Sequence, residues 1–250
     1  MSSKKKRLDI LLIESGLVKS RERAKTLIMS GNVLVNDTPV FHPGKLVLSD
    51  SKLRLKEEDV PYVSRGGLKL AKALKVFNMD VKGLVCLDVG ASTGGFTDCL
   101  LQNGAECVFA VDVGYGQLAW KLRQDSRVIL FERTNIRHMP GDALPRPVDL
   151  TVIDVSFISL RIVVPSVLKF IKYQAAIIAL IKPQFEIGKG KVGKGGIVKD
   201  PQDHDKVITG LASFFRETGL ECLGITESSI LGTKGNREFF IALKYAENIR

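Results

Sequence analysis

Two acidic residues and the glycine-rich segment between them indicate a ligand site near the middle of the chain. Asp88 lies near the end of an apolar, β-branched run, and small residues fill positions 90–95 directly after it. Asp112 ends a second apolar run, one strand–helix–strand step later. A strand, a glycine turn and a helix open the nucleotide-binding units of α/β proteins, because glycine has no Cβ to keep a ligand away from the backbone.

The chemistry of these residues favours S-adenosylmethionine over a dinucleotide. Ser92 stands where the pattern G-x-G-x-x-G has its second glycine, at which a pyrophosphate needs bare backbone. A carboxylate at Asp88 can pair with an ammonium group, the loop amides can hold a carboxylate, and Asp112 suits ribose hydroxyls. A generic glycine turn beside a solvated carboxylate is the alternative. The predicted cofactor contacts are Asp88, Gly90, Ser92, Gly94, Asp112 and Asn135, the last in the loop where such folds hold adenine.

Four further charged residues are expected around the same crevice. Asp154 and Lys182 end two later apolar runs, Lys69 lies in a helical pattern before the first strand, and Glu238 begins the last strand. In open α/β sheets the ligand crevice lies at the carboxyl ends of the strands. When a ribose 2′-hydroxyl attacks a sulfonium methyl group, a base must remove or steer the hydroxyl proton, and the two carboxylates would orient the two lysines. Unrelated surface ion pairs are the alternative.

The first part of the chain has the pattern of a small basic domain. Residues 8–15 and 20–30 have helical spacing, with Ser20 as a helix cap, and short strands are expected at 33–35, 40–41 and 52–55. Eight of the first 25 residues are Lys or Arg and three are acidic, in a chain of net charge +10. Such an excess suggests a polyanionic partner, and a solvated basic face is the alternative. The candidate RNA contacts are Lys19, Arg21, Arg23 and Lys25.

The elements that follow predict a larger α/β domain that positions the site. We expect a small α+β domain at 1–56, a charged linker at 57–63 and a Rossmann-like sheet with helices on both faces at 64–250. Strands are predicted at 85–89, 108–112, 128–130, 149–154, 175–182, 223–227 and 237–243, and helices at 116–124, 160–171 and 203–218. The glycine- and lysine-rich segment 183–200 is either a flexible basic flap over the substrate or a plain disordered loop.

The remaining composition excludes several classes of protein. The four cysteines form no C-x-x-C pair and the three histidines lie far apart, so no metal site is expected. Acidic residues interrupt the apolar positions near the N-terminus, and the longest uncharged apolar run, 175–181, is far too short to span a bilayer. We therefore expect a cytoplasmic protein without a membrane partner.

Two groups of motifs resemble known families. Arg7-Leu8-Asp9, the segment 16–21 and Gly31-Asn32-Val33-Leu34-Val35-Asn36 resemble the alpha-L RNA-binding motif of ribosomal small-subunit protein four. Lys69, Asp154, Lys182 and Glu238 resemble the Lys-Asp-Lys-Glu tetrad of FtsJ-type ribose 2′-O-methyltransferases. With both parts in this order, nearly the whole chain resembles the TlyA, or hemolysin A, family. The resemblance implies a catalytic tetrad, S-adenosylmethionine as cofactor, and ribosomal RNA or ribosomal subunits as partners of a monomer or weak dimer.

The same resemblance implies ribose methylation of cytidines in ribosomal RNA, in the large subunit and, for some members, also in the small one. Members with a short C-terminus tend to act on the large subunit alone, and this chain stops at Arg250, soon after its last predicted strand. The family's linker often carries Arg-x-Trp-Val, whereas Val60-Pro61-Tyr62-Val63 stands here, so a linker role in cofactor binding is not implied.

Other functions fit the sequence less well. A cytosine-C5 methyltransferase usually has a Pro-Cys pair, and an amino-methyltransferase has Pro-Pro-Tyr after its fourth strand; Val155-Ser156-Phe157 follows Asp154 here. A non-catalytic RNA-binding or ribosome-assembly factor would not need the tetrad. A membrane-lysing hemolysin, which the family's older name suggests, would need a membrane-inserting segment that the pattern does not show.

Overall fold

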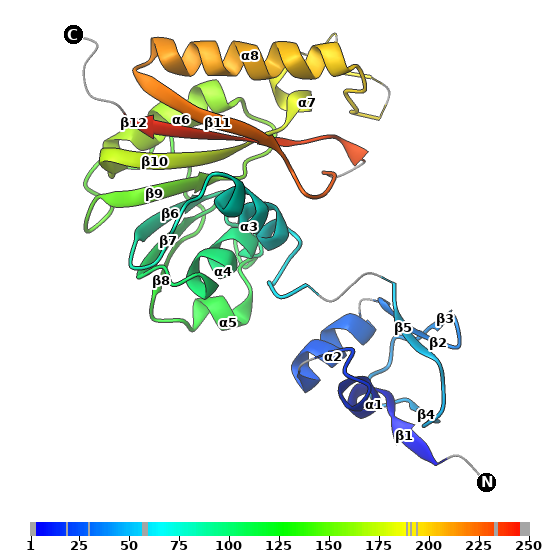
Figure 1. Cartoon of the computed structure of the whole chain (residues 1–250). Helices are drawn as coiled ribbons and strands as arrows, with labels where there is room; N and C mark the ends of the chain where they lie inside the picture. Colours follow the sequence, from blue (N-terminus) through cyan, green and yellow to red (C-terminus); the bar gives the residue numbers. More distant parts are fainter. Residues whose placement is uncertain are drawn as a thin grey trace. The chain divides into compact units, whose positions relative to one another are not determined.

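The computed structural model describes residues 4–18, 20–29, 31–56, 60–188, 190, 192–193, 195–232 and 235–245. The chain forms two compact units, Met1–Pro61 and Tyr62–Arg250, each with its own core (Figure 1). Tyr62 and Val63 pack within the larger unit, where the Val63 amide donates to Asp98 Oδ2 at 2.7 Å. The predicted boundaries of independently folding domains, at residues 56 and 64, stay a prediction.

The N-terminal unit is a small α+β structure. Its elements are β1 (Lys5–Arg7), α1 (Leu8–Glu14), α2 (Arg21–Met29), β2 (Val33–Val35), β3 (Thr38–Pro39), β4 (Leu46–Leu48) and β5 (Leu53–Leu55). Ser20 Oγ accepts a hydrogen bond from the Arg23 amide at 3.2 Å, which confirms the predicted helix cap. β2 pairs with β5 as expected, but its hairpin partner β3 is Thr38–Pro39 and not the predicted 40–41, because the turn at Asn36-Asp37 brings Thr38 directly opposite Val35. The antiparallel pair of β1 and β4 was not predicted, because three residues are too few to show an alternating pattern.

A seven-stranded sheet forms the centre of the larger unit, in the order β11-β12-β10-β9-β6-β7-β8. The strands are β6 (Val85–Val89), β7 (Cys107–Val111), β8 (Val128–Phe131), β9 (Val148–Ile153), β10 (Ile171–Ile181), β11 (Leu220–Glu227) and β12 (Phe239–Tyr245). β8, β7, β6, β9 and β10 run parallel, and β12 runs antiparallel to both of its neighbours. The predicted α/β class is confirmed.

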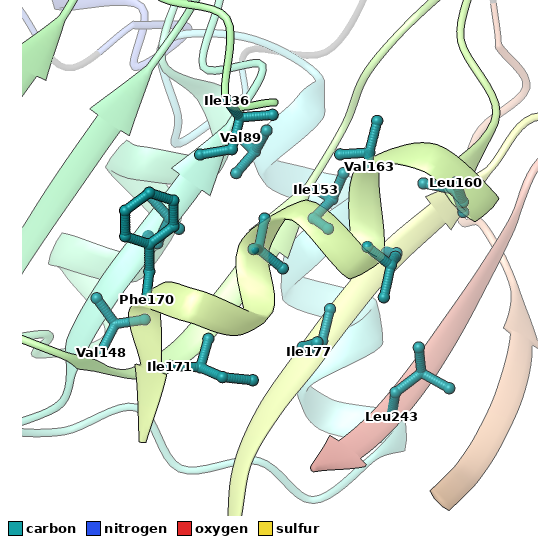
Figure 2. Close-up of a cluster of buried hydrophobic side chains, with 14 of the residues drawn as sticks. Val89, Ile136, Val148, Ile153, Leu160, Val163, Phe170, Ile171, Ile177 and Leu243 are labelled. Carbon is teal, nitrogen blue, oxygen red and sulfur yellow. The ribbon is translucent and has the colours of Figure 1, made fainter. Parts of the chain in front are cut away.

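Helices cover both faces of this sheet (Figure 1). They are α3 (Gly66–Val76), α4 (Gly95–Gln102), α5 (Trp120–Arg123), α6 (Leu160–Val167) with the 3₁₀ turn η1 (Leu168–Phe170), α7 (Pro183–Glu186) and α8 (Pro201–Glu217). Apolar residues of α3, α4 and α5 form one core cluster with the sheet, and those of α6 and α8 form another. Figure 2 shows part of the second cluster, where Leu160 and Val163 of α6 lie over Ile153 and Ile177 of the sheet. None of the described helices is long and apolar enough to cross a bilayer.

Two predicted helices are wrong in extent. The helix expected at 116–124 is only α5, because Gly116 has a positive φ of 72° and Ala119 is extended. The helix expected at 160–171 ends at Val167, and Ile171 already begins β10, where it pairs with Val148. In both places backbone conformation interrupts a run of residues whose side-chain spacing alone is helical.

Candidate active site

The topology brings the predicted site residues to one edge of the sheet. Asp112 follows β7, Asp154 follows β9 and Lys182 follows β10, so all three lie at carboxyl ends of parallel strands. Because β12 is antiparallel to β10, its first residues lie at the same edge, and Glu238 directly precedes β12. This edge is where ligands bind in open α/β sheets.

The glycine loop after β6 brings several backbone segments together at this edge. Gly90 has a φ of 85°, and a Cβ there would lie 2.4 Å from the Asp154 carbonyl oxygen. Gly94 has a φ of 93°, and a Cβ there would lie 2.3 Å from Leu122 Cδ1. Gly90 therefore permits the close approach of the β9 loop, whereas Gly94 permits the packing of α5 on the loop.

Asp112 is the residue that holds the loop in shape. Its Oδ2 accepts the Ser92 amide and its Oδ1 accepts the Gly114 amide, each at 2.7 Å. A carboxylate oxygen has two lone pairs, so each oxygen can accept one further hydrogen bond. The predicted contact with ribose hydroxyls remains open to Asp112 in this arrangement.

Asp88 lies in a different environment from the other acids. Its side chain is fully buried, Oδ2 accepts Thr97 Oγ1 at 2.6 Å, and Oδ1 has no hydrogen-bond partner among the described residues. Burial raises the pKa of this carboxyl to about 7. Asp88 thus joins β6 to α4, and its pairing with a ligand ammonium stays a prediction.

A cavity of about 840 Å³ extends along the loop and has the lining expected for S-adenosylmethionine. Its wall includes four of the six predicted cofactor residues, namely Gly90, Ser92, Asp112 and Asn135. Apolar side chains such as Val113 and Ile136 lie beside Asp112 and Asn135, which suits a base next to a ribose. The volume lies within the range of about 300–1,000 Å³ that is typical of small-molecule sites. The residues present therefore fit the cofactor.

A second hollow, of about 420 Å³, lies against the first and has two cationic residues in its wall. Arg65 and Lys69 are in its wall, together with Leu231 of the loop between β11 and β12. Gly90, Ser92 and Asp154 line both hollows. A group in the larger hollow and a group in the smaller one can therefore meet at this shared wall.

The four predicted catalytic residues form two ion pairs. Lys69 Nζ lies 2.6 Å from Glu238 Oε2, with side chains that are 13% and 3% exposed. Lys182 Nζ lies 2.6 Å from Asp154 Oδ1 and donates to Ser156 Oγ at 2.9 Å. The carboxylates thus fix the direction of both ammonium groups, and Asp154 and Lys69 face the smaller hollow. Their catalytic role stays a prediction.

Phe157 is a residue of this site that sequence reasoning did not identify. Its side chain is 89% exposed, its φ is +65°, and its ring lies 4.9 Å from that of Phe185. Both rings line the larger hollow. A bulky residue in the left-handed region is strained, and such strain is concentrated at functional sites. The one available signal was an aromatic residue in the loop that follows Asp154.

The predicted RNA contacts of the N-terminal unit have unequal surroundings. Arg21 Nε lies 3.0 Å from Asp9 Oδ2, and Arg7 bonds the same fully buried carboxylate at 2.9 Å. The hydrogen bond from Arg7, with support from Arg21, holds the pKa of Asp9 well below its usual range. Lys25 is exposed and Arg23 is partly exposed, whereas Lys19 lies outside the described residues. Among the described residues, Arg21 therefore has an ion pair with a buried carboxylate, whereas Lys25 has none.

Comparisons with known proteins agree with both units. A model of the S4 domain matches residues 6–53, and a model of FtsJ-like methyltransferases matches residues 62–245. YqxC of Bacillus subtilis is 50% identical over 98% of this chain and 88% of its own length. The 16S/23S rRNA (cytidine-2′-O)-methyltransferase TlyA of Mycobacterium tuberculosis is 44% identical over 97% of this chain and 91% of its own.

A solved structure from Streptococcus thermophilus is 43% identical, covers 99% of this chain and 90% of its own, and has a TM-score of 0.76. The match extends over both units and is far above the level at which fold alone is shared. The chain therefore belongs to the TlyA, or hemolysin A, family, in which an S4 RNA-binding domain precedes an FtsJ-like methyltransferase domain that uses S-adenosylmethionine.

Proposed function

We propose that this protein transfers the methyl group of S-adenosylmethionine to the ribose 2′-hydroxyl of a cytidine in ribosomal RNA, with large-subunit RNA as the acceptor. One observation supports the reaction above all: one member of each of two lysine–carboxylate pairs, Lys69 and Asp154, lines the smaller hollow, and Asp154 also lines the cofactor-sized one. The name of the M. tuberculosis relative gives cytidine-2′-O chemistry on both 16S and 23S RNA, which supports the reaction and includes the proposed acceptor.

The chain's own residues have distinct parts in this reaction. When bound, the cofactor supplies a methyl group on a positively charged sulfur. Asp154 and Glu238 each hold one lysine, and Lys182 also donates to Ser156 Oγ, so each ammonium keeps at least one N–H for a substrate hydroxyl. Lys69 and Asp154 line the smaller hollow, and Lys182 lies next to it through its contact with Asp154. We assign the orientation of the hydroxyl to Lys69 and Lys182, and the hydroxyl proton passes to one of these two amines in its uncharged form, which alone has a lone pair to accept it. In-line positioning of hydroxyl oxygen and methyl carbon supplies most of the rate.

The surroundings of the two hollows support an RNA acceptor. The exposed ring of Phe157, at the rim of the larger hollow, offers a stacking surface for an unpaired base. The basic side chains of the N-terminal unit would add sequence-independent phosphate contacts. Because residues of one chain line both hollows, we propose that a monomer is sufficient for the reaction, acting on ribosomes or their subunits in the cytoplasm.

The direct test is to identify the methylated nucleoside. Purified protein and S-adenosylmethionine are incubated with 30S or 50S subunits from a strain that lacks the modification, and the RNA is digested and analysed by mass spectrometry. We expect 2′-O-methylcytidine from 50S RNA. A base-methylated nucleoside would contradict the reaction, and 2′-O-methylcytidine from 30S RNA alone would contradict the choice of acceptor.

A further inference from the structure

The short helix α7 contacts the loop after β9 at both of its ends. Lys182 directly precedes α7, and its Nζ reaches Asp154 at 2.6 Å and Ser156 at 2.9 Å. Glu186 is the last residue of α7, one helical turn after Lys182. Any group that fixes Glu186 therefore also limits the position of Lys182.

Glu186 is fixed by the start of α6. Its Oε2 accepts Ser159 Oγ at 2.6 Å, and its Oε1 accepts the Leu160 amide at 2.8 Å. The first amides of a helix have no partner within the helix, and the partial positive charge at this end favours a carboxylate. Both oxygens are thus engaged in charge-assisted hydrogen bonds, which are stronger than neutral ones.

A third contact joins the same two segments. The rings of Phe157 and Phe185 lie 4.9 Å apart, between the Lys182 contacts at one end of α7 and the Glu186 contacts at the other. The segment 154–160 is therefore held against the segment 182–186 at three successive points. Neither Glu186 nor Lys182 is among the described residues that line the two hollows, but Lys182 Nζ contacts Asp154, which lines both. Both Glu186 oxygens are instead engaged with the start of α6.

We propose that Glu186 is a positioning residue, which holds Lys182 opposite Asp154 by fastening α7 to the start of α6. This inference rests on the proposed methyl transfer, since it assigns Glu186 a role in that reaction through Lys182. Without the carboxylate, one end of α7 is released, and Lys182 and Phe185 keep only their own contacts with the β9 loop. An error of about 1 Å in such an alignment can reduce a rate by about 100-fold.

The test compares Glu186→Ala and Glu186→Gln in single-turnover methyl transfer with saturating cofactor and RNA. The Gln side chain can still accept from the Leu160 amide and donate to Ser159 Oγ, so we expect Glu186→Gln to remain within about threefold of wild type. We expect Glu186→Ala to be slower by about 10- to 100-fold. Ser166→Gly is the matched control, because the backbone freedom of glycine weakens α6 at a position away from Glu186, where Ser166 Oγ bonds only the Ile162 carbonyl of the same helix.

Hydrogen exchange of the cofactor-free proteins separates this inference from the proposed function. We expect Glu186→Ala to raise exchange in both segments, 154–160 and 182–187, and Ser166→Gly to raise it in α6 alone. If wild type itself transfers no methyl group, the proposed function fails and exchange still shows whether Glu186 couples the segments. Unchanged exchange at 182–187, equal losses in the Ala and Gln variants, or a loss in Ser166→Gly as large as that in Glu186→Ala would overturn the inference.

Discussion

The buried carboxyl of Asp88 gives the larger unit an unusual dependence of stability on pH. Burial raises the pKa of Asp88 from 3.8 to about 7. Between these values the unfolded chain has lost the proton and the folded chain keeps it, so the free energy of unfolding falls as the pH rises. The stabilisation that this group contributes is fully present below about pH 4 and is lost as the pH rises through about 7.

The magnitude follows from the shift. One pKa unit corresponds to about 1.4 kcal/mol, so the full loss from Asp88 is on the order of 4 kcal/mol. About 3 kcal/mol of this falls between pH 5 and pH 8, because the unfolded carboxyl is already mostly ionised at pH 5. Asp88→Asn removes the titration, while the amide oxygen can still accept from Thr97 Oγ1.

The assay is urea unfolding of the cofactor-free protein at pH 5 and pH 8. Far-UV circular dichroism is read beside the fluorescence of Trp120, which is the single tryptophan of the chain and lies in the larger unit. From pH 5 to pH 8 we expect the free energy of unfolding of wild type to fall by about 3 kcal/mol more than that of Asp88→Asn, because only wild type loses the stabilisation from the Asp88 proton. Parallel pH profiles, within about 0.5 kcal/mol, would refute the reasoning, since surface groups common to both proteins cancel in the comparison.

Three further predictions concern the site and the RNA-binding unit. Glu238→Gln leaves Lys69 without its charged partner, so we expect methyl transfer to fall by at least about 100-fold and the free energy of unfolding by about 3 kcal/mol; Glu227→Gln, which breaks the exposed pair with Arg237, is the control and should leave transfer unchanged. Phe157→Ala should raise the KM for RNA about tenfold through lost base stacking, with Tm unchanged because the ring is exposed, and an unchanged KM would contradict the stacking surface. Lys25→Ala should reduce the slope of log affinity against log salt by about 1 without a change in Tm. Arg21→Ala should reduce the same slope and also destabilise the N-terminal unit by about 1 kcal/mol, because it removes the bond to Asp9. Equal melting curves for the two variants would count against this structural role of Arg21.

The sequence predicts much of the fold because its strands are short apolar runs with charged or small residues at their ends. The runs at 85–89 and 149–154 match β6 and β9 within one residue. Once the strands are parallel, residues that follow them must gather at one edge, and the same holds for a residue that precedes an antiparallel strand. The common location of Asp154 and Lys182 therefore follows from the pattern, whereas that of Glu238 also depends on the antiparallel direction of β12, which the pattern does not give.

The sequence does not predict the environment of each acid at that edge. Asp112 and Asp154 come directly after the last residue of a strand, whereas Asp88 comes one residue before the end of β6. In the register of the sheet Asp88 lies opposite Ala110 and Val152, two residues before the level of Asp112 and Asp154. Its carboxyl is therefore inside the sheet against Thr97 of α4, whereas the other two acids lie beyond the ends of their strands. The apolar pattern around the three acids is nearly the same.

The choice of ion-pair partners is also beyond the sequence. Lys69 pairs with Glu238, which lies at the far end of the chain, and this pairing depends on how α3 packs beside β12. The same is true of Glu186, whose partner helix α6 begins 26 residues earlier. Such contacts are set by the arrangement of elements around the sheet, and no local spacing encodes it.

The most direct test of the proposed reaction is the transfer of a tritiated methyl group from S-adenosylmethionine to unmodified ribosomal subunits, with wild type beside Lys182→Ala. We predict counts in 50S RNA with the wild-type protein and a loss of at least about 100-fold in the variant, with folding and RNA binding intact. Wild-type counts that persist in Lys182→Ala would contradict the role of the Lys182–Asp154 pair. No counts on either subunit or on free RNA, from a folded protein that binds RNA, would contradict the enzymatic account.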